Sequence, residues 1–378
     1  GADHAAMRSI YEDFERQNPD IRLVQDMSPD LSVVIERAND MLVLDRMPDV
    51  ISTNGGGAFV ANAIRKHTAL DLRPYLDADP AFAACVPETV LATWTADDGA
   101  IYTLPDAREV VGYWYNEQLL RKAGVTDSGT PAPPRTWEEL LAACEKLHAA
   151  SIGTAAMVSH EKEFLLGGAL AASGADGLAF MQGKRPACTR ETAEAAFALL
   201  AQMEHFALAG KYNEADAEQL FFEGKTALYF NGVWANTQLH QTRNHEPIAY
   251  APLPGQDGGT LAYLSSSSGY VIGNTGTPET IDACVRFVKY MLSEPVQQRI
   301  VTQTKQAAAS PQVTPEWTAQ HVPVLGQALA ACSGADETIL TLSTLLTQAD
   351  SSALAEYVAQ AQPTAGQREK VISIVSDS

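Results

Sequence analysis

Several short segments of the sequence contain residue types that catalytic motifs use, but their spacing does not meet what each chemistry requires. Gly224 to Thr226 reads like the end of a phosphate-binding loop, but the glycine needed five positions earlier is replaced by Gln219. His160-Glu161 begins like the zinc-binding pair of a metallopeptidase, but Phe164 stands where the second histidine ligand would follow. Neither segment therefore predicts phosphate or metal chemistry.

Two further segments fail in the same way. The glycines at 55 to 57 follow a predicted strand, but they do not have the GxGxxG spacing of a dinucleotide-binding turn. The serines at 265 to 268 end at Gly269 without forming a GxSxG nucleophile elbow. The eight histidines show no paired metal-ligand spacing. We therefore expect a protein that is not an enzyme and has no catalytic residue, bound metal or cofactor.

Apolar periodicity predicts the elements that would position any binding residues. Met7, Ile10, Tyr11 and Phe14 recur at helical spacing, and similar patterns predict helices at 28–46, 58–66, 190–209 and 278–292, after Thr136 and in the 336–360 tail. Residues 21–24 and 48–51 read as short strands. This alternation of helix and strand predicts α/β units with a largely parallel sheet.

The first residues lead directly into the first predicted helix. Gly1-Ala2-Asp3 shows no initiator methionine and no signal-peptide pattern. An α/β unit of this kind is expected to start with a strand, so we expect a chain that was processed or trimmed.

Composition narrows the class of protein. A chain of 378 residues is long enough for two domains, and 46% hydrophobic with 19% charged residues is a globular composition. The net charge of −20 opposes binding to nucleic acid or anionic lipid. The five cysteines form no CxxC pair, and those in helical patterns, Cys144 and Cys284, are expected to be buried free thiols.

Four ordered segments resemble the solute-binding proteins of carbohydrate ABC importers, the maltose-binding-protein-like family. They are Phe14 to Ile21, Met47 to Ile51, Gly99 to Leu140, with its Tyr113-Trp114-Tyr115-Asn116 and Pro134-Arg135-Thr136-Trp137 runs, and Phe222 to Ala235, with its Asn231-Gly232-Val233-Trp234 run. Weaker similarity continues from Gly269 to Ser310. The resemblance thus covers most of the first 310 residues.

The resemblance implies a two-lobed α/β periplasmic-binding-protein fold, with three interlobe crossings and a ligand cleft at the hinge. The crossings would lie near residues 107–112, 265–269 and 308–312. Lobe 1 would then comprise 1–108 and 269–308, and lobe 2 would comprise 112–265 and 311–378.

The function implied by the resemblance is capture of an oligosaccharide outside the cytoplasmic membrane. Hinge closure would trap the sugar, and permease subunits of an ABC importer in the membrane would receive it from a monomeric receptor, located in a periplasm or carried as a cell-surface lipoprotein. Two alternatives stay open. The same fold could bind a non-sugar solute such as a glycerol phosphate ester or a polyamine, or the protein could process glycosides.

A sugar ring offers apolar C–H faces and polar hydroxyl edges, so a sugar site needs aromatic and planar polar side chains. The resemblance places Trp234 on the family's ring-stacking tryptophan and Glu109 on an acidic hydroxyl acceptor. Asn54, Gly55 and Gly56 follow a predicted strand, where α/β sheets bind ligands. This loop departs from maltose-binding protein, which has larger residues there, so maltose itself is not the expected ligand.

Five further residues complete the expected ligand-binding set. Asp106 and Arg108 flank the first expected crossing, and Ser267 lies at the second. Phe164 falls near an aromatic position of the family, although a core phenylalanine is the competing interpretation. Tyr113 belongs to an alternating strand of which one face at most could line a cleft.

Overall fold

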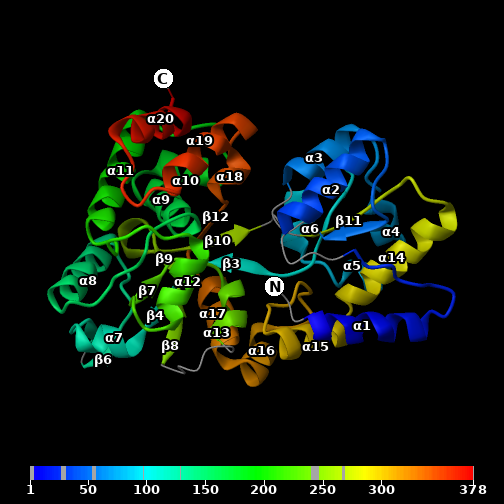
Figure 1. Ribbon diagram of the computed structural model, residues 1–378, viewed down its shortest axis with the longest axis horizontal. Coiled ribbons are helices and arrows are strands. Elements are labelled where there is room, and N and C mark those ends of the chain that lie inside the picture. Colours follow the sequence, from blue (N-terminus) through cyan, green and yellow to red (C-terminus); the bar gives the residue numbers. More distant parts are fainter. Residues whose placement is uncertain are drawn as a thin grey trace. The chain divides into compact units, whose positions relative to one another are not determined.

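The computed structural model describes residues 4–26, 31–52, 57–96, 98–127, 129–239, 247–265 and 269–377. The chain divides into two compact units (Figure 1). Unit 1 comprises residues 1–108 and 266–322, and unit 2 comprises residues 109–265 and 323–378. The two-lobed fold expected from the sequence is confirmed. The last boundary differs, because residues 311–322 group with unit 1 and not with the second lobe.

Unit 1 is a small sheet between two layers of helices. Its helices are α1 (His4–Gln17), α2 (Leu31–Val43), α3 (Gly57–Arg65), α4 (Arg73–Ala78), α5 (Pro80–Ala83), α6 (Glu88–Trp94), α14 (Pro278–Leu292), α15 (Glu294–Thr304) and α16 (Pro315–His321). Its strands, in sheet order, are β1 (Val50–Ser52), β11 (Gly269–Ile272) and β2 (Leu104–Pro105).

The alternation of side chains along β11 explains why helices cover both faces of this sheet. Tyr270 and Ile272 pack into one apolar cluster with residues of α1 and α14, including Ile10 and Val288. Val271 points the other way, into a second cluster with residues of α2 and α3. A fully buried strand of this kind needs an apolar layer on each side.

Two expectations about the strands of unit 1 are wrong. The sheet is antiparallel, because β11 comes from a distant part of the chain and runs antiparallel to both β1 and β2. Residues 21–24 form no strand: the Leu23 amide donates to the Glu15 carboxylate at 2.6 Å and not to a neighbouring strand, and Val24 is 91% exposed. Alternating residue types alone do not make a strand where no partner backbone pairs with it.

Unit 2 contains the larger core. Its helices are α7 (Glu117–Lys122), α8 (Trp137–Ala149), α9 (His160–Ala172), α10 (Ala175–Met181), α11 (Arg190–His205), α12 (Glu214–Phe222), η1 (Val233–Ala235), α13 (Asn236–Leu239), η2 (Gln256–Gly258), α17 (Pro323–Ser333), α18 (Leu342–Leu345), α19 (Gln348–Val358) and α20 (Ala365–Val375). Helix α20 packs beside both α19 and α11 (Figure 1).

The strands of unit 2 form two larger sheets and one short hairpin. They are β3 (Glu109–Val111), β4 (Tyr113–Asn116), β5 (Thr126–Asp127), β6 (Thr130–Pro131), β7 (Leu228–Tyr229), β8 (Ile248–Ala251), β9 (Leu253–Pro254), β10 (Thr260–Ser265) and β12 (Glu337–Ile339). One sheet has the order β7-β4-β8, and the other has β12-β10-β3 with β9 also on β10. Among the described ladders only β10 with β12 is parallel.

Candidate functional site

Trp234 lies in η1, where the chain leaves β7, and its side chain is half-buried. A Cβ on Gly232 would stand only 2.0 Å from the indole Cζ3 atom, so the indole lies directly against the backbone of this glycine. This contact gives a physical reason for the Asn-Gly-x-Trp sequence. Two hydrogen bonds fix the backbone of this segment. The Trp114 indole N–H donates to the Gly232 carbonyl at 3.0 Å, and the Tyr250 hydroxyl donates to the Asn231 carbonyl at 2.9 Å.

Phe164 of α9 supports Trp234. The two ring centroids are 6.2 Å apart, and Phe164 also meets Tyr263 edge-on at 5.2 Å. Phe164 is only 3% exposed. The structure therefore favours the interpretation of Phe164 as a core residue behind Trp234, and leaves Trp234 as the accessible aromatic surface of the pair.

His160 and Glu214 join this group, although neither was expected from the sequence. The imidazole Nδ1 of His160 lies 2.6 Å from the Glu214 carboxylate, and its ring is 5.8 Å from Phe164. Each residue is the first of a helix, α9 and α12 respectively. The sequence contains one indication of His160: it lies four residues before Phe164, and residues four apart share a helix face.

The charges around His160 come mainly from carboxylates. The hydrogen bond to the Glu214 carboxylate raises the pKa of His160, burial opposes this shift, and the charges of Glu214, Glu163 and Glu109 add to it. Glu109, half-buried in β3, therefore lies within electrostatic reach of His160. Burial, followed by the charge of Glu214, raises the pKa of Glu218 to about 7.

Tyr113 is not available to a ligand. Its side chain is fully buried in the core of unit 2, and its hydroxyl donates to the Pro134 carbonyl at 2.7 Å. Trp114 and Tyr115, its neighbours in β4, are also buried. We therefore remove Tyr113 from the candidate site: both faces of β4 pack against other parts of unit 2.

Unit 1 contains a polar group of its own. The Ser52 hydroxyl, at the end of β1, donates to the Asp106 carboxylate just after β2. Burial lowers the pKa of the Arg108 guanidinium, and the Arg108 amide donates to the Ala307 carbonyl at 3.4 Å. Asn54, Gly55 and Gly56, which follow Ser52, lie outside the described residues, and so does Ser267.

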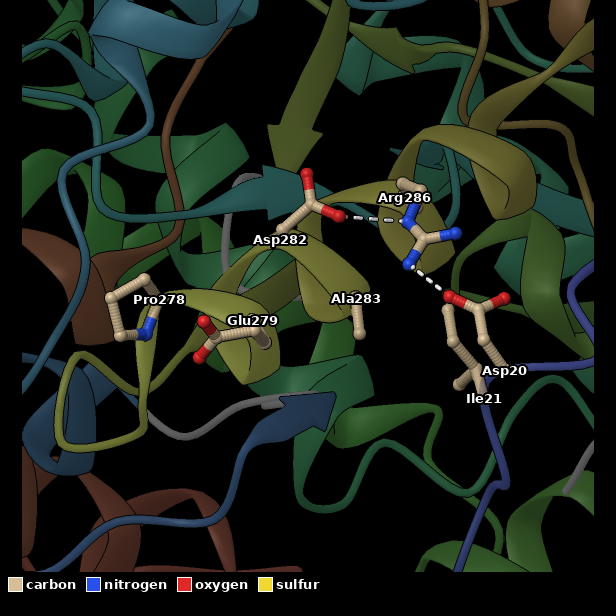
Figure 2. Close-up of a pocket in the computed structure, with 7 residues that line it drawn as sticks. All are labelled: Asp20, Ile21, Pro278, Glu279, Asp282, Ala283 and Arg286. Atoms are coloured by element: carbon tan, nitrogen blue, oxygen red, sulfur yellow. Dashed lines mark hydrogen bonds and ion pairs between the residues drawn. The ribbon is translucent and has the colours of Figure 1, made fainter.

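A hollow of about 430 Å³ lies elsewhere on unit 1 (Figure 2). Arg286 of α14 is bonded there to Asp282 at 2.9 Å and to Asp20 at 2.8 Å. The sequence-predicted binding residues are not among those that line it. Because Arg286 already pairs with both Asp20 and Asp282, this hollow is not taken as the binding site.

No cluster of three or more His, Cys, Asp or Glu side chains in the described part of the chain could hold a metal ion. Over the same residues, no helix has both the length and the apolar character needed to cross a bilayer. The candidate site thus consists of the accessible aromatic face of Trp234 on Phe164, and of the His160–Glu214 pair that adjoins Phe164. This chemistry suits ring stacking and hydroxyl hydrogen bonds.

Comparison with protein families identifies the class. Residues 9–324 match the family model described as bacterial extracellular solute-binding protein. The chain belongs to this family. The family is one of extracellular receptors that bind solutes, not one of enzymes. No sequence among the curated proteins matches the chain.

Solved structures of solute-binding proteins share the fold. A Streptococcus pneumoniae solute-binding protein in complex with the blood group A-trisaccharide is 22% identical, with 98% of this chain and 93% of that chain covered and a TM-score of 0.75. A chitin oligosaccharide binding protein is 21% identical (98% and 92% covered, TM-score 0.79). Maltose-bound MalE3 of T. maritima is 18% identical (97% and 94%, TM-score 0.73).

Proposed function

We propose that this solute-binding protein captures an oligosaccharide outside the cytoplasmic membrane and delivers it to the permease subunits of an ABC importer. The observation that carries the proposal is Trp234, a half-buried indole backed by Phe164, whose ring also lies 5.8 Å from that of His160, the partner of Glu214. The trisaccharide, chitin-oligosaccharide and maltose ligands of similarly folded proteins support this solute class.

In the proposed site each group has a distinct role. Trp234 stacks on the apolar face of a sugar ring, since an indole buries a large area with few rotatable bonds. Glu109 accepts hydrogen bonds from hydroxyl groups. Asp106 and Arg108 of unit 1, together with the loop at 54–56 and Ser267, supply further polar contacts. The receptor acts as a monomer, which light scattering of the purified protein checks.

The acidic surroundings of Trp234 help to rank the alternative solutes. A phosphate ester would require cationic partners, preferably arginines, whereas the charged groups near His160 are the carboxylates of Glu109, Glu163 and Glu214. The carboxylates of Glu109 and Glu214 suit hydroxyl groups and would also suit the ammonium groups of a polyamine, whereas Glu163 is buried and accepts from the Ser343 amide. A ligand screen should therefore include both alternatives.

The test is a thermal-shift screen with linked di- to hexasaccharides, glycerol 3-phosphate and spermidine, followed by calorimetry on any hit. Ligand at about a hundred times its Kd should stabilise the fold by roughly 2.7 kcal/mol. Trp234→Ala should weaken sugar binding by about 30-fold, the loss of a hot-spot aromatic worth about 2 kcal/mol. A response to spermidine or glycerol 3-phosphate with none to any sugar would overturn the proposal.

Trp317→Ala is the matched control. Trp317 is also half-buried, but it lies in α16 of unit 1 with its ring stacked on His321 at 3.9 Å. Its removal should leave the Kd for sugar unchanged. Equal losses in both variants would show that Trp234 has no specific part in binding.

A further inference from the structure

Glu161 follows His160 in the sequence, but its side chain has no part in the proposed function. It lies in the first turn of α9, between His160 and Phe164, and is only 2% exposed. A buried carboxyl group is costly unless its oxygens find hydrogen-bond donors. The donors that it finds indicate its role.

The two carboxylate oxygens of Glu161 bind two different segments of backbone. Oε2 accepts from the Met157 amide at 2.8 Å, and Oε1 accepts from the Phe230 amide at 3.3 Å. The turn that presents the first amide is strained, with φ of 55° at Met157 and 50° at Ser159. Non-glycine residues seldom adopt positive φ unless the surrounding structure holds them there.

These two segments lead to the two aromatic residues of the candidate site. The strained turn leads into α9 and Phe164, while Phe230 leads through Asn231 and Gly232 to Trp234. The 6.2 Å separation between the Phe164 and Trp234 rings therefore spans two pieces of chain that one carboxyl group joins.

We propose that Glu161 is a positioning residue for ligand binding, which holds the Trp234 segment against the start of α9 so that the indole is presented on Phe164. The expected effect on ligand affinity rests on the proposed function. The placement of Trp234 by Glu161 can be tested without any ligand.

The neighbouring buried charges do not share this role. Lys162 pairs with Glu204 at 3.0 Å, and Glu163 accepts from the Ser343 amide at 3.1 Å, so both anchor α9 to other parts of unit 2. Burial raises the pKa of Glu161 to about 8, despite the opposing hydrogen bonds from the Phe230, Met157 and Val158 amides.

The experiment uses Glu161→Gln in the full chain labelled with fluorotryptophan, whose five ¹⁹F signals can be assigned by single Trp→Phe variants. Glutamine keeps the size of the side chain, but its amide nitrogen donates and cannot accept from a backbone N–H. The Trp234 signal should shift or broaden while the Trp137 and Trp317 signals stay in place. The Kd for the sugar found in the screen should rise about tenfold, equivalent to about 1.4 kcal/mol.

Glu163→Gln is the matched control, and it should leave both the Trp234 signal and the Kd unchanged. An unchanged Trp234 signal and Kd in Glu161→Gln would overturn the inference. If the wild type binds no sugar, the proposed function fails, yet the ¹⁹F signals still decide whether Glu161 places Trp234. Glu161→Met is the second variant: if both variants also lose the native Trp137 signal, Glu161 is a general stability residue and the positioning role is rejected.

Discussion

The tryptophans of unit 2 show how environment separates a binding residue from a core residue. Trp114 and Trp137 are buried, and their indole N–H groups donate to backbone carbonyls at 3.0 and 3.1 Å. Trp234 instead stays half-buried against a glycine. A buried indole normally satisfies its N–H within the protein, whereas an accessible one retains a face for a ligand.

The sequence predicted part of this residue-level pattern. The family resemblance pointed to Trp234 through its Asn-Gly-x-Trp motif, and the structure adds that the glycine of this motif lies directly against the indole. Burial depends on distant contacts, which explains why Tyr113 was wrongly included and why the competing core interpretation of Phe164 is the better one. His160 and Glu214 were missed for the same reason: they are 54 residues apart and meet only in the folded unit.

The His160–Glu214 pair gives a prediction at this scale. Glu214→Gln should lower the pKa of His160 towards the ordinary histidine value, because it removes the hydrogen bond and charge that contribute most to raising it. The charges of Glu109 and Glu163 remain, so the pKa should not fall completely. Titration of the His160 ring by NMR measures the change. Glu223→Gln, at the other end of α12, should leave this pKa unaltered.

The same pair predicts a pH dependence of stability. A histidine whose folded-state pKa is raised stabilises the fold fully below its unfolded pKa of about 6.5, and this contribution is lost as the pH rises through the folded value. The unfolding free energy of the wild type should thus be higher than that of Glu214→Gln, and this difference should be larger at about pH 5.5 than at about pH 8.5. The side chains are 50% and 45% exposed, so solvent screening limits the difference to at most about 1 kcal/mol. Denaturant titrations showing the larger gap at the higher pH would contradict this assignment.

At the scale of elements, the start of α12 fixes Glu214 in place. The Asn213 side chain accepts from the Asp216 amide at 2.9 Å, and the Asp216 side chain accepts from the Asn213 amide at 2.9 Å. Such a reciprocal capping box satisfies two amides that the helix leaves unpaired. Glu214 is the next residue after the cap, so the cap determines where its carboxylate meets His160.

Asn213→Ala should therefore have two effects. It should lower the unfolding free energy by about 1 kcal/mol, the usual cost of losing an N-cap. It should also lower the pKa of His160, because Glu214 is held less firmly. Thr364→Ala removes the capping box of α20 and is the matched control: it should lower the unfolding free energy by a similar amount without changing the pKa of His160. If both variants shift the His160 pKa equally, the cap of α12 has no special link to the site.

Helices were predicted more reliably than strands because their signal is local. The stripes that predicted the helices at 190–209 and 278–292 correspond to α11 and α14, apart from a few residues at their ends. The partners of strands are set by distant segments, as with β11 between β1 and β2. The tail at 336–360 shows the same limit, since Glu337–Ile339 pairs with β10 as a strand before α18 and α19 begin.

At the scale of the whole molecule, each unit has its own apolar core, and the chain passes between the units after Arg108, Ser265 and Val322. The last boundary falls after Val322, beyond the expected position near 308–312, because α16 packs with unit 1. The resemblance weakened beyond Ser310, so no motif marked this boundary. It was visible only from the contacts of the folded chain.

The five cysteines are distributed over both cores, and all are buried free thiols, as expected from the sequence for Cys144 and Cys284. Burial raises the pKa of Cys144 and Cys332 to about 12, and the pKa values of the remaining three are also raised. Thiol exchange and oxidation proceed through the thiolate and require access. This chain belongs to an extracellular family, and burial of its five thiols would protect them from oxidation in oxidising surroundings.

This arrangement predicts that the native protein reacts negligibly with a thiol reagent such as dithionitrobenzoate, while all five thiols react once the chain is unfolded in guanidinium. Reducing agent should not change the melting temperature, since no disulfide contributes to the fold. Reaction should follow global unfolding, and ligand should slow it, because a ligand that binds the folded state lowers the unfolded population. A thiol that reacts rapidly in the native protein, or a melting temperature lowered by reductant, would show that burial does not protect these cysteines.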